Sequence, residues 1–321
     1  MPPASSALPD VPAGRGVLIV RNALSGTAVI RTDPAAIFAE RLPGAAVREL
    51  GDGEDLADVV SEAIEGDAPP AVLGVYGGDG SVSRMAHLAR RHGRPLLAMP
   101  GGTFNHFVRA LGIDGVGTAI DALEAGHTVD VGVVEATADG DEAVTVLNVV
   151  SIGAYPELIE ERERRSSLGK WLGGVVATWK ALRRAEPLTI VREGRRARVW
   201  SVFISVGRND PDRVATMQRQ DVVADVLDVR IHHARGSRVR ALASLAFGKR
   251  TAAVLRAVRL FPRDADVERL LLPEIEMWVV PEPGRPSVFV HDGELVEREE
   301  SGFRLHCVAV PAALRVYAPA Q

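Results

Sequence analysis

Short apolar runs alternate with helix-like stretches along the first third of the chain. The apolar runs predict strands at 16–21, 45–50, 71–76 and 95–99. The stretches between and after them predict helices at 34–41, 55–65, 82–91 and 104–111. Alternation of this kind favours a parallel sheet with helices on both faces. The pattern therefore predicts an α/β, Rossmann-like N-terminal domain.

The pattern changes near residue 127, after which short strand-like runs dominate. The expected strands are 128–133, 142–148, 188–192, 197–206, 226–232, 269–280, 287–291 and 303–310. Such a series predicts a β-rich, sandwich-like second domain. We expect a flexible tail at 1–15, the α/β domain at 16–127, the β-rich domain at 128–311, and a return of 312–321 to the first domain. The sequence of residues 155–184 indicates two further helices.

Two glycine turns follow neighbouring predicted strands. The sequence Gly77-Gly78-Asp79-Gly80-Ser81 follows 71–76, and Gly101-Gly102-Thr103-Phe104-Asn105 follows 95–99. Glycine lets a ligand approach the main chain, and ligands bind at the carboxyl ends of strands in open α/β sheets. Free N–H groups at a following helix favour a phosphate. One such turn is often only a packing feature, whereas two together favour a binding site. Neither a P-loop nor a dinucleotide fingerprint is present.

The string GGDGSV followed by PGGTFNHFVRALGI resembles the catalytic domain of the diacylglycerol kinase family, which includes bacterial lipid kinases and sphingosine kinases. The first turn alone is also similar to that of NAD kinases and 6-phosphofructokinases. The turn Asn22-Ala23-Leu24-Ser25-Gly26 is similar to the family's Asn-Pro-x-Ser-Gly without its proline. The resemblance implies an NAD kinase/phosphofructokinase-like first domain, with ATP bound in the cleft between the two domains.

The resemblance also implies the residues of a site. Those expected to bind the nucleotide are Asn22, Ser25, Gly26, Gly77, Gly78, Asp79, Gly80, Ser81, Gly101, Gly102, Thr103 and Asn105. Alone, Asp292-Gly293 is an ordinary hairpin signal. The family, however, carries Asp-Gly-Glu at this place, and Glu294 is then our first choice for the proton acceptor, with Asp292 beside it on metal or nucleotide. The metal ligands implied are Asp79 for Mg²⁺ and Asp225 for a second, structural magnesium.

Three positions depart from the family pattern. His106 stands where an aspartate is frequent, and Ser81 replaces a threonine. The family's Asp-Gly-x-Leu-Asp segment, which holds the structural magnesium, is represented by Asp221–Asp228 without its glycine. Because a histidine cannot replace an acid as a magnesium ligand, the second turn is expected to keep nucleotide binding and to lose one carboxylate.

Composition narrows the class of protein. The net charge of −4 predicts no general attraction to nucleic acid. The chain has a single cysteine, Cys307, so it cannot form an intramolecular disulfide, which suits a cytoplasmic protein. We expect Cys307 to be a small buried residue. No apolar run is long enough to span a bilayer, and 1–16 lacks the features of a secretory signal. The stretch 232–263 is basic and amphipathic; it indicates either peripheral contact with the inner membrane face or a helix packed on the second domain.

These observations predict an ATP- and Mg²⁺-dependent lipid kinase with a diacylglycerol-like substrate. Two alternatives stay open: a nucleotide-binding regulatory homologue that has lost catalysis, and a kinase for a soluble alcohol or NAD. The expected partner is a lipid substrate and not a nucleic acid, while a homodimer is left open.

Overall fold

The chain folds into two compact units, which we call the N-terminal unit (1–133 with 310–321) and the C-terminal unit (134–309). The computed structural model describes residues 8–22, 34–51, 53–102, 105–153, 187–209, 219, 221–223, 225–234, 267–281, 287–298 and 301–320. The chain passes into the C-terminal unit within β5 (Thr128–Ala138) and leaves it within β15 (Phe303–Tyr317). The predicted boundaries at 127 and 311 lie close to these two crossings.

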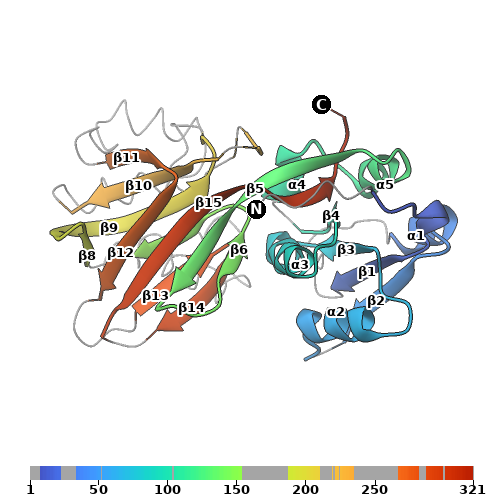
Figure 1. Ribbon diagram of the computed structural model, residues 1–321, viewed down its shortest axis with the longest axis horizontal. Helices are drawn as coiled ribbons and strands as arrows, with labels where there is room; N and C mark the ends of the chain where they lie inside the picture. Colours follow the sequence, from blue (N-terminus) through green and yellow to red (C-terminus); the bar gives the residue numbers. More distant parts are fainter. Residues whose placement is uncertain are drawn as a thin grey trace, which may run out of the picture. The chain divides into compact units, whose positions relative to one another are not determined.

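A parallel sheet flanked by helices forms the N-terminal unit (Figure 1). Its strands are β1 (Val17–Asn22), β2 (Ala46–Leu50), β3 (Val72–Gly77), β4 (Leu96–Pro100) and the end of β15. Its helices are η1 (Pro12–Gly14), α1 (Ala35–Arg41), α2 (Leu56–Glu65), α3 (Asp79–Arg91), α4 (His106–Ala110) and α5 (Val116–Glu124). Every residue of β3 and β4 is buried, which suits a parallel sheet covered on both faces.

The strand order β15-β4-β3-β1-β2 places a topological switch point between β1 and β3, since the chain leaves β1 toward one side and returns on the other. The strand registers align the carboxyl ends of β1, β3 and β4. Arg21 of β1 lies opposite Tyr76 of β3, and Gly77 of β3 lies opposite Pro100 of β4. The segments that follow β1, β3 and β4 therefore leave the sheet at one edge.

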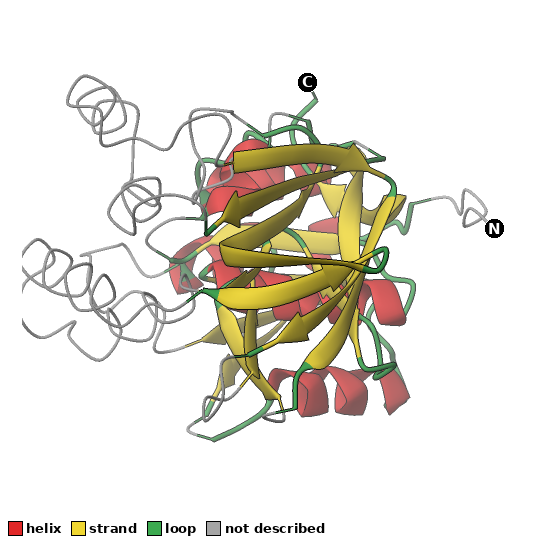
Figure 2. Cartoon of the chain, turned by 90° about the vertical axis from the view of Figure 1, so that its left-hand side faces the viewer, coloured by secondary structure: helices red, strands yellow, loops and turns green. Residues whose placement is uncertain are grey.

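Strands are the regular elements of the C-terminal unit among its described residues, and Figure 2 shows strands in yellow. They are β6 (Val144–Val146), β7 (Val150–Gly153), β8 (Leu188–Arg192), β9 (Arg195–Val206), β10 (Leu227–His233), β11 (Val267–Leu272), β12 (Glu274–Val280), β13 (Ser287–His291) and β14 (Glu294–Arg298), with parts of β5 and β15. The pairs β9–β10, β13–β14 and β7–β9 are antiparallel, and apolar side chains from strands far apart in the sheet order share one core. The sequence-based fold class is confirmed.

Details of the prediction need correction. The expected strand 269–280 is two strands, because Pro273 has no N–H to continue the ladder; β11 pairs with β10, while β12 pairs with β8 and β15. Helix α3 begins at Asp79 rather than at 82, so much of the first glycine turn is helical. Strand β14 was not predicted.

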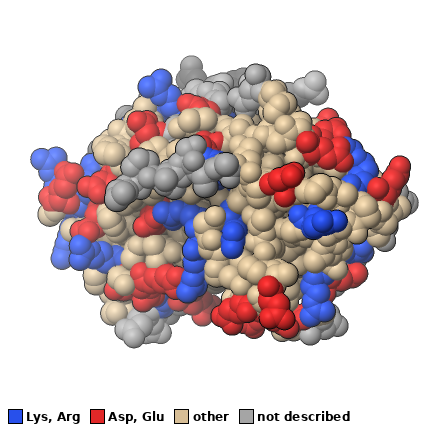
Figure 3. All heavy atoms as spheres, turned by 45° about the vertical axis from the view of Figure 1, so that its right-hand side comes forward, with Lys and Arg blue, Asp and Glu red and all other residues tan. Residues whose placement is uncertain are grey.

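Two sequence features lie wholly or mostly outside the described residues. The expected helices at 155–184 fall outside them, as does nearly all of the basic stretch 232–263. Among the described residues, no helix has the length and apolar character needed to cross a bilayer. On the face shown in Figure 3, acidic and basic side chains are interspersed rather than gathered by sign.

Candidate active site

The two glycine turns pack directly against each other at the carboxyl end of β3 and β4. The N–H of Gly101 donates to the carbonyl of Gly77 at 2.8 Å. A Cβ on Gly101 would lie 2.8 Å from the Gly77 nitrogen, and one on Gly102 would lie 2.5 Å from the Gly78 Cα. Carbon atoms in contact prefer about 3.5–4.0 Å. Close approach of the two main chains thus accounts for glycine at 101 and 102.

Asn105 and Asp79 fix the geometry of the second turn. Asn105 is buried and left-handed, with φ of 52°, a conformation that asparagine tolerates better than most residues. Its Oδ1 accepts the Gly102 N–H at 2.9 Å, and its Nδ2 donates to the Gly102 carbonyl at 2.8 Å. Asp79 Oδ1 accepts the His106 N–H at 2.7 Å, which joins the start of α3 to the start of α4. These hydrogen bonds show that Asn105 holds the second turn.

The start of α3 offers room and hydrogen-bond donors. A Cβ on Gly80 would meet no atom within 4 Å, and one on Gly78 would lie 3.5 Å from Gly102, an ordinary contact. Among the described residues, no side chain caps this 13-residue helix. The N–H groups of a helix's first turn have no intrahelical partner, so those of α3 can donate to an anion. Among the glycines of the two turns, Gly78 and Gly80 are therefore those at which the described residues leave space for a Cβ.

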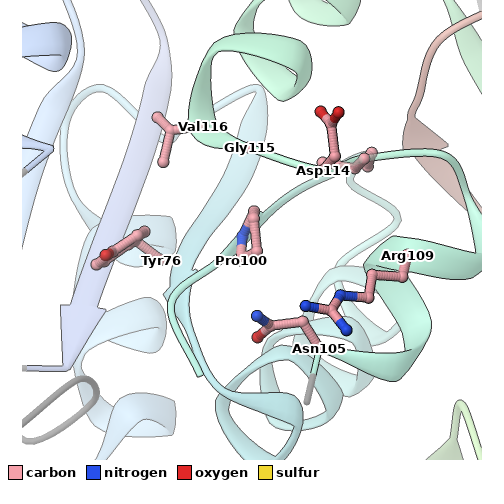
Figure 4. Close-up of a pocket in the computed structure, with 8 residues that line it drawn as sticks. Tyr76, Pro100, Asn105, Arg109, Asp114, Gly115 and Val116 are labelled. Carbon is pink, nitrogen blue, oxygen red and sulfur yellow. The ribbon is translucent and has the colours of Figure 1, made fainter. Parts of the chain in front are cut away.

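A pocket of about 230 Å³ opens beside the second turn (Figure 4). Its walls are Tyr76, Pro100, Asn105, Arg109, Ile113, Asp114, Gly115 and Val116. The guanidinium of Arg109 extends toward Asn105, whereas the Asp114 carboxylate points away from it (Figure 4). Asp114 accepts a hydrogen bond from the Thr118 hydroxyl, so part of its capacity is already used. The pocket therefore presents an exposed cation to a ligand at the edge of the sheet.

The Asp-Gly-Glu segment forms the turn of the β13–β14 hairpin in the C-terminal unit. Asp292 and Gly293 both have positive φ, and His291 pairs with Glu294. Asp292 is buried, with Oδ2 accepting the Leu147 N–H at 2.7 Å and Oδ1 those of Asn148 and Val149 at 2.7 and 3.0 Å. Because these bonds engage both oxygens, the geometry supports a positioning role for Asp292.

Glu294 is the more accessible of the two acids. Its side chain is 37% exposed, and its Oε2 lies 4.0 Å from Nε2 of His291. The two groups are too far apart for a hydrogen bond, and their contact is electrostatic only. Of the two acids predicted for catalysis, Glu294 is therefore the one whose side chain is partly exposed.

The remaining predicted residues are distributed as follows. Ser25, Gly26 and Thr103 lie outside the described residues, and Asn22 is described only as the backbone end of β1. Asp225 is exposed. Among the described residues, no group of three or more His, Cys, Asp or Glu side chains could hold a metal ion. A metal on Asp79 would therefore need further ligands, such as phosphate oxygens.

Arg109 was not among the predicted site residues, although the sequence carries a signal for it. It follows Asn105 by four positions, and such positions lie on one face of a helix. A basic residue placed this way after a glycine turn reaches the same edge as the turn itself.

Comparisons with known proteins agree with this geometry. The model of the family "Diacylglycerol kinase catalytic domain" matches residues 16–136. Two similar solved structures, from Bacillus anthracis str. Sterne, carry the provisional name diacylglycerol kinase; they are 18% and 16% identical, with TM-scores of 0.62 and 0.60. A third, a diacylglycerol kinase of the same organism, is 16% identical with a TM-score of 0.57.

The alignments cover 94% of this chain in each case, and 97%, 97% and 96% of those chains in the same order. At these identities the structures show a shared fold across both units, and the family model adds the sequence evidence for the first. Residues 16–136 thus match the diacylglycerol kinase catalytic domain, as the two glycine turns predicted.

Proposed function

We propose that this chain is a lipid kinase that uses ATP and Mg²⁺ to phosphorylate a lipid hydroxyl, with diacylglycerol as the model acceptor. The observation that carries the proposal is the start of α3. Among the described residues it has no side-chain cap; a Cβ on Gly80 would meet no atom there within 4 Å, and one on Gly78 would make only an ordinary contact with the second turn. Phosphoryl transfer depends mainly on positioning and on neutralising charge, and this arrangement is suited to both.

The N-terminal unit supplies the phosphate-binding groups in this proposal. The first N–H groups of α3 donate to phosphate oxygens, and the positive end of the helix dipole favours the anion. Asp79 uses Oδ1 for the His106 N–H, and among the described residues its Oδ2 has no hydrogen-bond partner. That oxygen would hold Mg²⁺, which, when bound, would neutralise charge on the triphosphate.

The proton acceptor in this proposal is Glu294, the residue that the family resemblance implies. The acceptor oxygen forms a bond to the γ-phosphorus while the bond from that phosphorus to the β-phosphate bridging oxygen breaks. The proton of the hydroxyl passes to the Glu294 carboxylate, which is half-exposed and able to meet a substrate. Asp292 holds the hairpin that carries Glu294 through its bonds to the 147–149 backbone.

A transfer assay with γ-labelled ATP tests the proposal. The purified chain is offered diacylglycerol in vesicles, a lipid extract, soluble alcohols and NAD in parallel, with and without Mg²⁺. We expect Mg²⁺-dependent label in the organic phase. Label confined to the aqueous phase would refute a lipid acceptor and favour the soluble-alcohol or NAD alternative.

Glu294→Gln separates catalysis from binding. We expect the variant to lose transfer by about 100-fold or more, as for a general base, while ATP binding measured by calorimetry is unchanged. Glu297→Gln is the matched control, because Glu297 lies on the same strand and is exposed. Equal activity of both variants and the wild type would remove Glu294 from the mechanism.

One observation favours a second candidate, a regulatory protein that binds a nucleotide without catalysis. His106 stands at the start of α4 where the family often has an acid, and its N–H is the group that Asp79 accepts from. ATP binding by the wild type with no transfer to any acceptor in the assay above would favour this candidate.

A further inference from the structure

A fully buried carboxylate, Asp228, lies on β10 in the segment for which the family resemblance implies a structural magnesium. It has no exposed surface, and the Asn209 N–H donates to its Oδ2 at 3.0 Å. A buried ionised carboxylate is costly unless charges and donors compensate it. Asp228 therefore needs a neighbouring cation to neutralise its charge.

Two arginines supply that charge. Arg269 donates from Nε to Oδ1 at 3.0 Å and from Nη2 to Oδ2 at 2.6 Å. Arg230, itself 2% exposed, donates more weakly from Nε at 3.4 Å and from Nη2 at 3.3 Å. With the Asn209 N–H, five donors face a group that has about four acceptor positions. No lone pair of Asp228 is left for a metal ion.

The strand register shows that the two arginines also need Asp228. Arg230 of β10 lies directly opposite Arg269 of β11, and like charges in such a pair are destabilising. Asp228, two residues before Arg230, lies on the same face of β10 and bridges both guanidinium groups. Burial alone would raise the pKa of Asp228, but the two arginines and the Asn209 N–H hold it below its usual value.

The second buried acid of this unit, Asp292, is also compensated by protein groups. Three backbone N–H groups donate to it, and Arg219 attracts it electrostatically. Arg219 donates to the carbonyls of Leu147 and Val222, each at 3.0 Å. Burial lowers the pKa of Arg219 to about 10, so the side chain keeps its charge at neutral pH.

We propose that the C-terminal unit replaces the structural magnesium implied by its family resemblance with fixed guanidinium groups, Arg269 and Arg230 on Asp228 and Arg219 beside Asp292. The predicted metal ligand Asp225 is exposed and belongs to no ligand cluster among the described residues. The fold of this unit therefore does not depend on a divalent cation.

Thermal unfolding of the full chain without nucleotide tests the proposal. We expect the same Tm in EDTA and in excess Mg²⁺. A Tm that falls in EDTA would overturn the proposal, and loss of that fall in Asp228→Asn would identify Asp228 as the metal ligand. Because neither nucleotide nor acceptor is present, the outcome does not depend on whether the chain is a kinase.

A pair of arginine variants tests the counter-ions themselves. Arg269→Ala leaves buried Asp228 undercompensated, and we expect its Tm to fall by about 10 °C. The matched control is Arg304→Ala, which breaks an exposed pair with Glu276 in the same unit and should change Tm by about 1 °C. Equal shifts in the two variants would contradict the proposal.

Should Arg269→Ala fail to fold, titration of the nucleotide-free wild type with Mn²⁺, followed by electron paramagnetic resonance, gives an independent answer. We expect no tight site that depends on Asp228. A tight site that persists in Asp79→Ala and disappears in Asp228→Asn would show a metal where we place guanidinium groups.

Discussion

The substitutions Gly102→Ala and Gly80→Ala should both weaken ATP binding, but for different physical reasons. At 102 the added Cβ would lie 2.5 Å from the Gly78 Cα, and 3.1 Å from Asn105 Oδ1. At 80 it would meet no atom within 4 Å. One substitution therefore tests the packing of the turns on each other, and the other tests the space that we assign to phosphate.

The cost of Gly102→Ala follows from the overlap. Relieving a carbon–carbon distance of 2.5 Å requires a displacement of about 1 Å, since such contacts prefer about 3.5–4.0 Å. Overpacking of this kind costs about 1–3 kcal/mol of unfolding free energy. The displacement would also disturb the two hydrogen bonds between Asn105 and Gly102, so that ATP binding weakens along with stability.

Gly80→Ala should separate the two properties. With open space around it and no positive φ recorded for it, Gly80 can accept a Cβ in the folded chain. The substitution should stabilise the protein by about 0.4–1 kcal/mol, because alanine has less freedom to lose on folding. ATP affinity should nevertheless fall about tenfold or more, the effect of losing one charge-assisted hydrogen bond of about 1.5 kcal/mol.

Urea unfolding and calorimetric titration with ATP and Mg²⁺ measure both effects on the same preparations. We expect Gly102→Ala to lose stability and affinity together, and Gly80→Ala to keep or gain stability while losing affinity. Wild-type affinity in Gly80→Ala would show that no phosphate occupies the space beside α3. Wild-type stability in Gly102→Ala would refute the packing argument.

Three further predictions concern single side chains. Arg109→Ala should weaken ATP binding about tenfold with no change in Tm, because in our proposal this exposed, pocket-lining guanidinium binds the nucleotide. Unchanged affinity in calorimetry would exclude Arg109 from the site. Burial lowers the pKa of His232 to about 4, so the unfolded chain binds more protons below its ordinary value near 6.5, and stability falls as pH drops from 6.5 toward 4. Between pH 7 and pH 5 this loss is about 2 kcal/mol, and urea unfolding of His232→Asn should show a correspondingly smaller pH effect; an equal loss in both proteins would contradict it. Burial raises the pKa of Cys307 to about 12, so the native thiol should resist a disulfide reagent that labels it in urea, and rapid native labelling would show that it is accessible.

Periodic patterns in the sequence account for most of the N-terminal unit. The runs 71–76 and 95–99 contain only apolar residues, glycine and proline, and β3 and β4 are buried along their whole length. Apolar spacing likewise indicates α2. Errors arise where a local rule competes with pairing. Pro273 divides one predicted strand into two strands with different partners, and β14 is too polar and too exposed to stand out.

The site was less accessible to sequence reasoning than the fold. The spacing of the glycine turns indicates the edge of the sheet, but it does not show that Gly102 is glycine because Gly78 packs against it. Nor does it show that the oxygens of Asp292 are taken by backbone N–H groups of 147–149. Contacts between residues far apart in the chain decide these roles, and one sequence alone does not report them.

The central claim is that the glycine turns of the N-terminal unit bind the phosphates of a nucleotide. A crystal structure with Mg²⁺ and a non-hydrolysable ATP analogue tests it most directly. We predict phosphate oxygens within hydrogen-bond distance of the N–H groups of 78–81, and a metal ion on Asp79. Density for the analogue elsewhere, with the start of α3 bound only to water, would contradict the account.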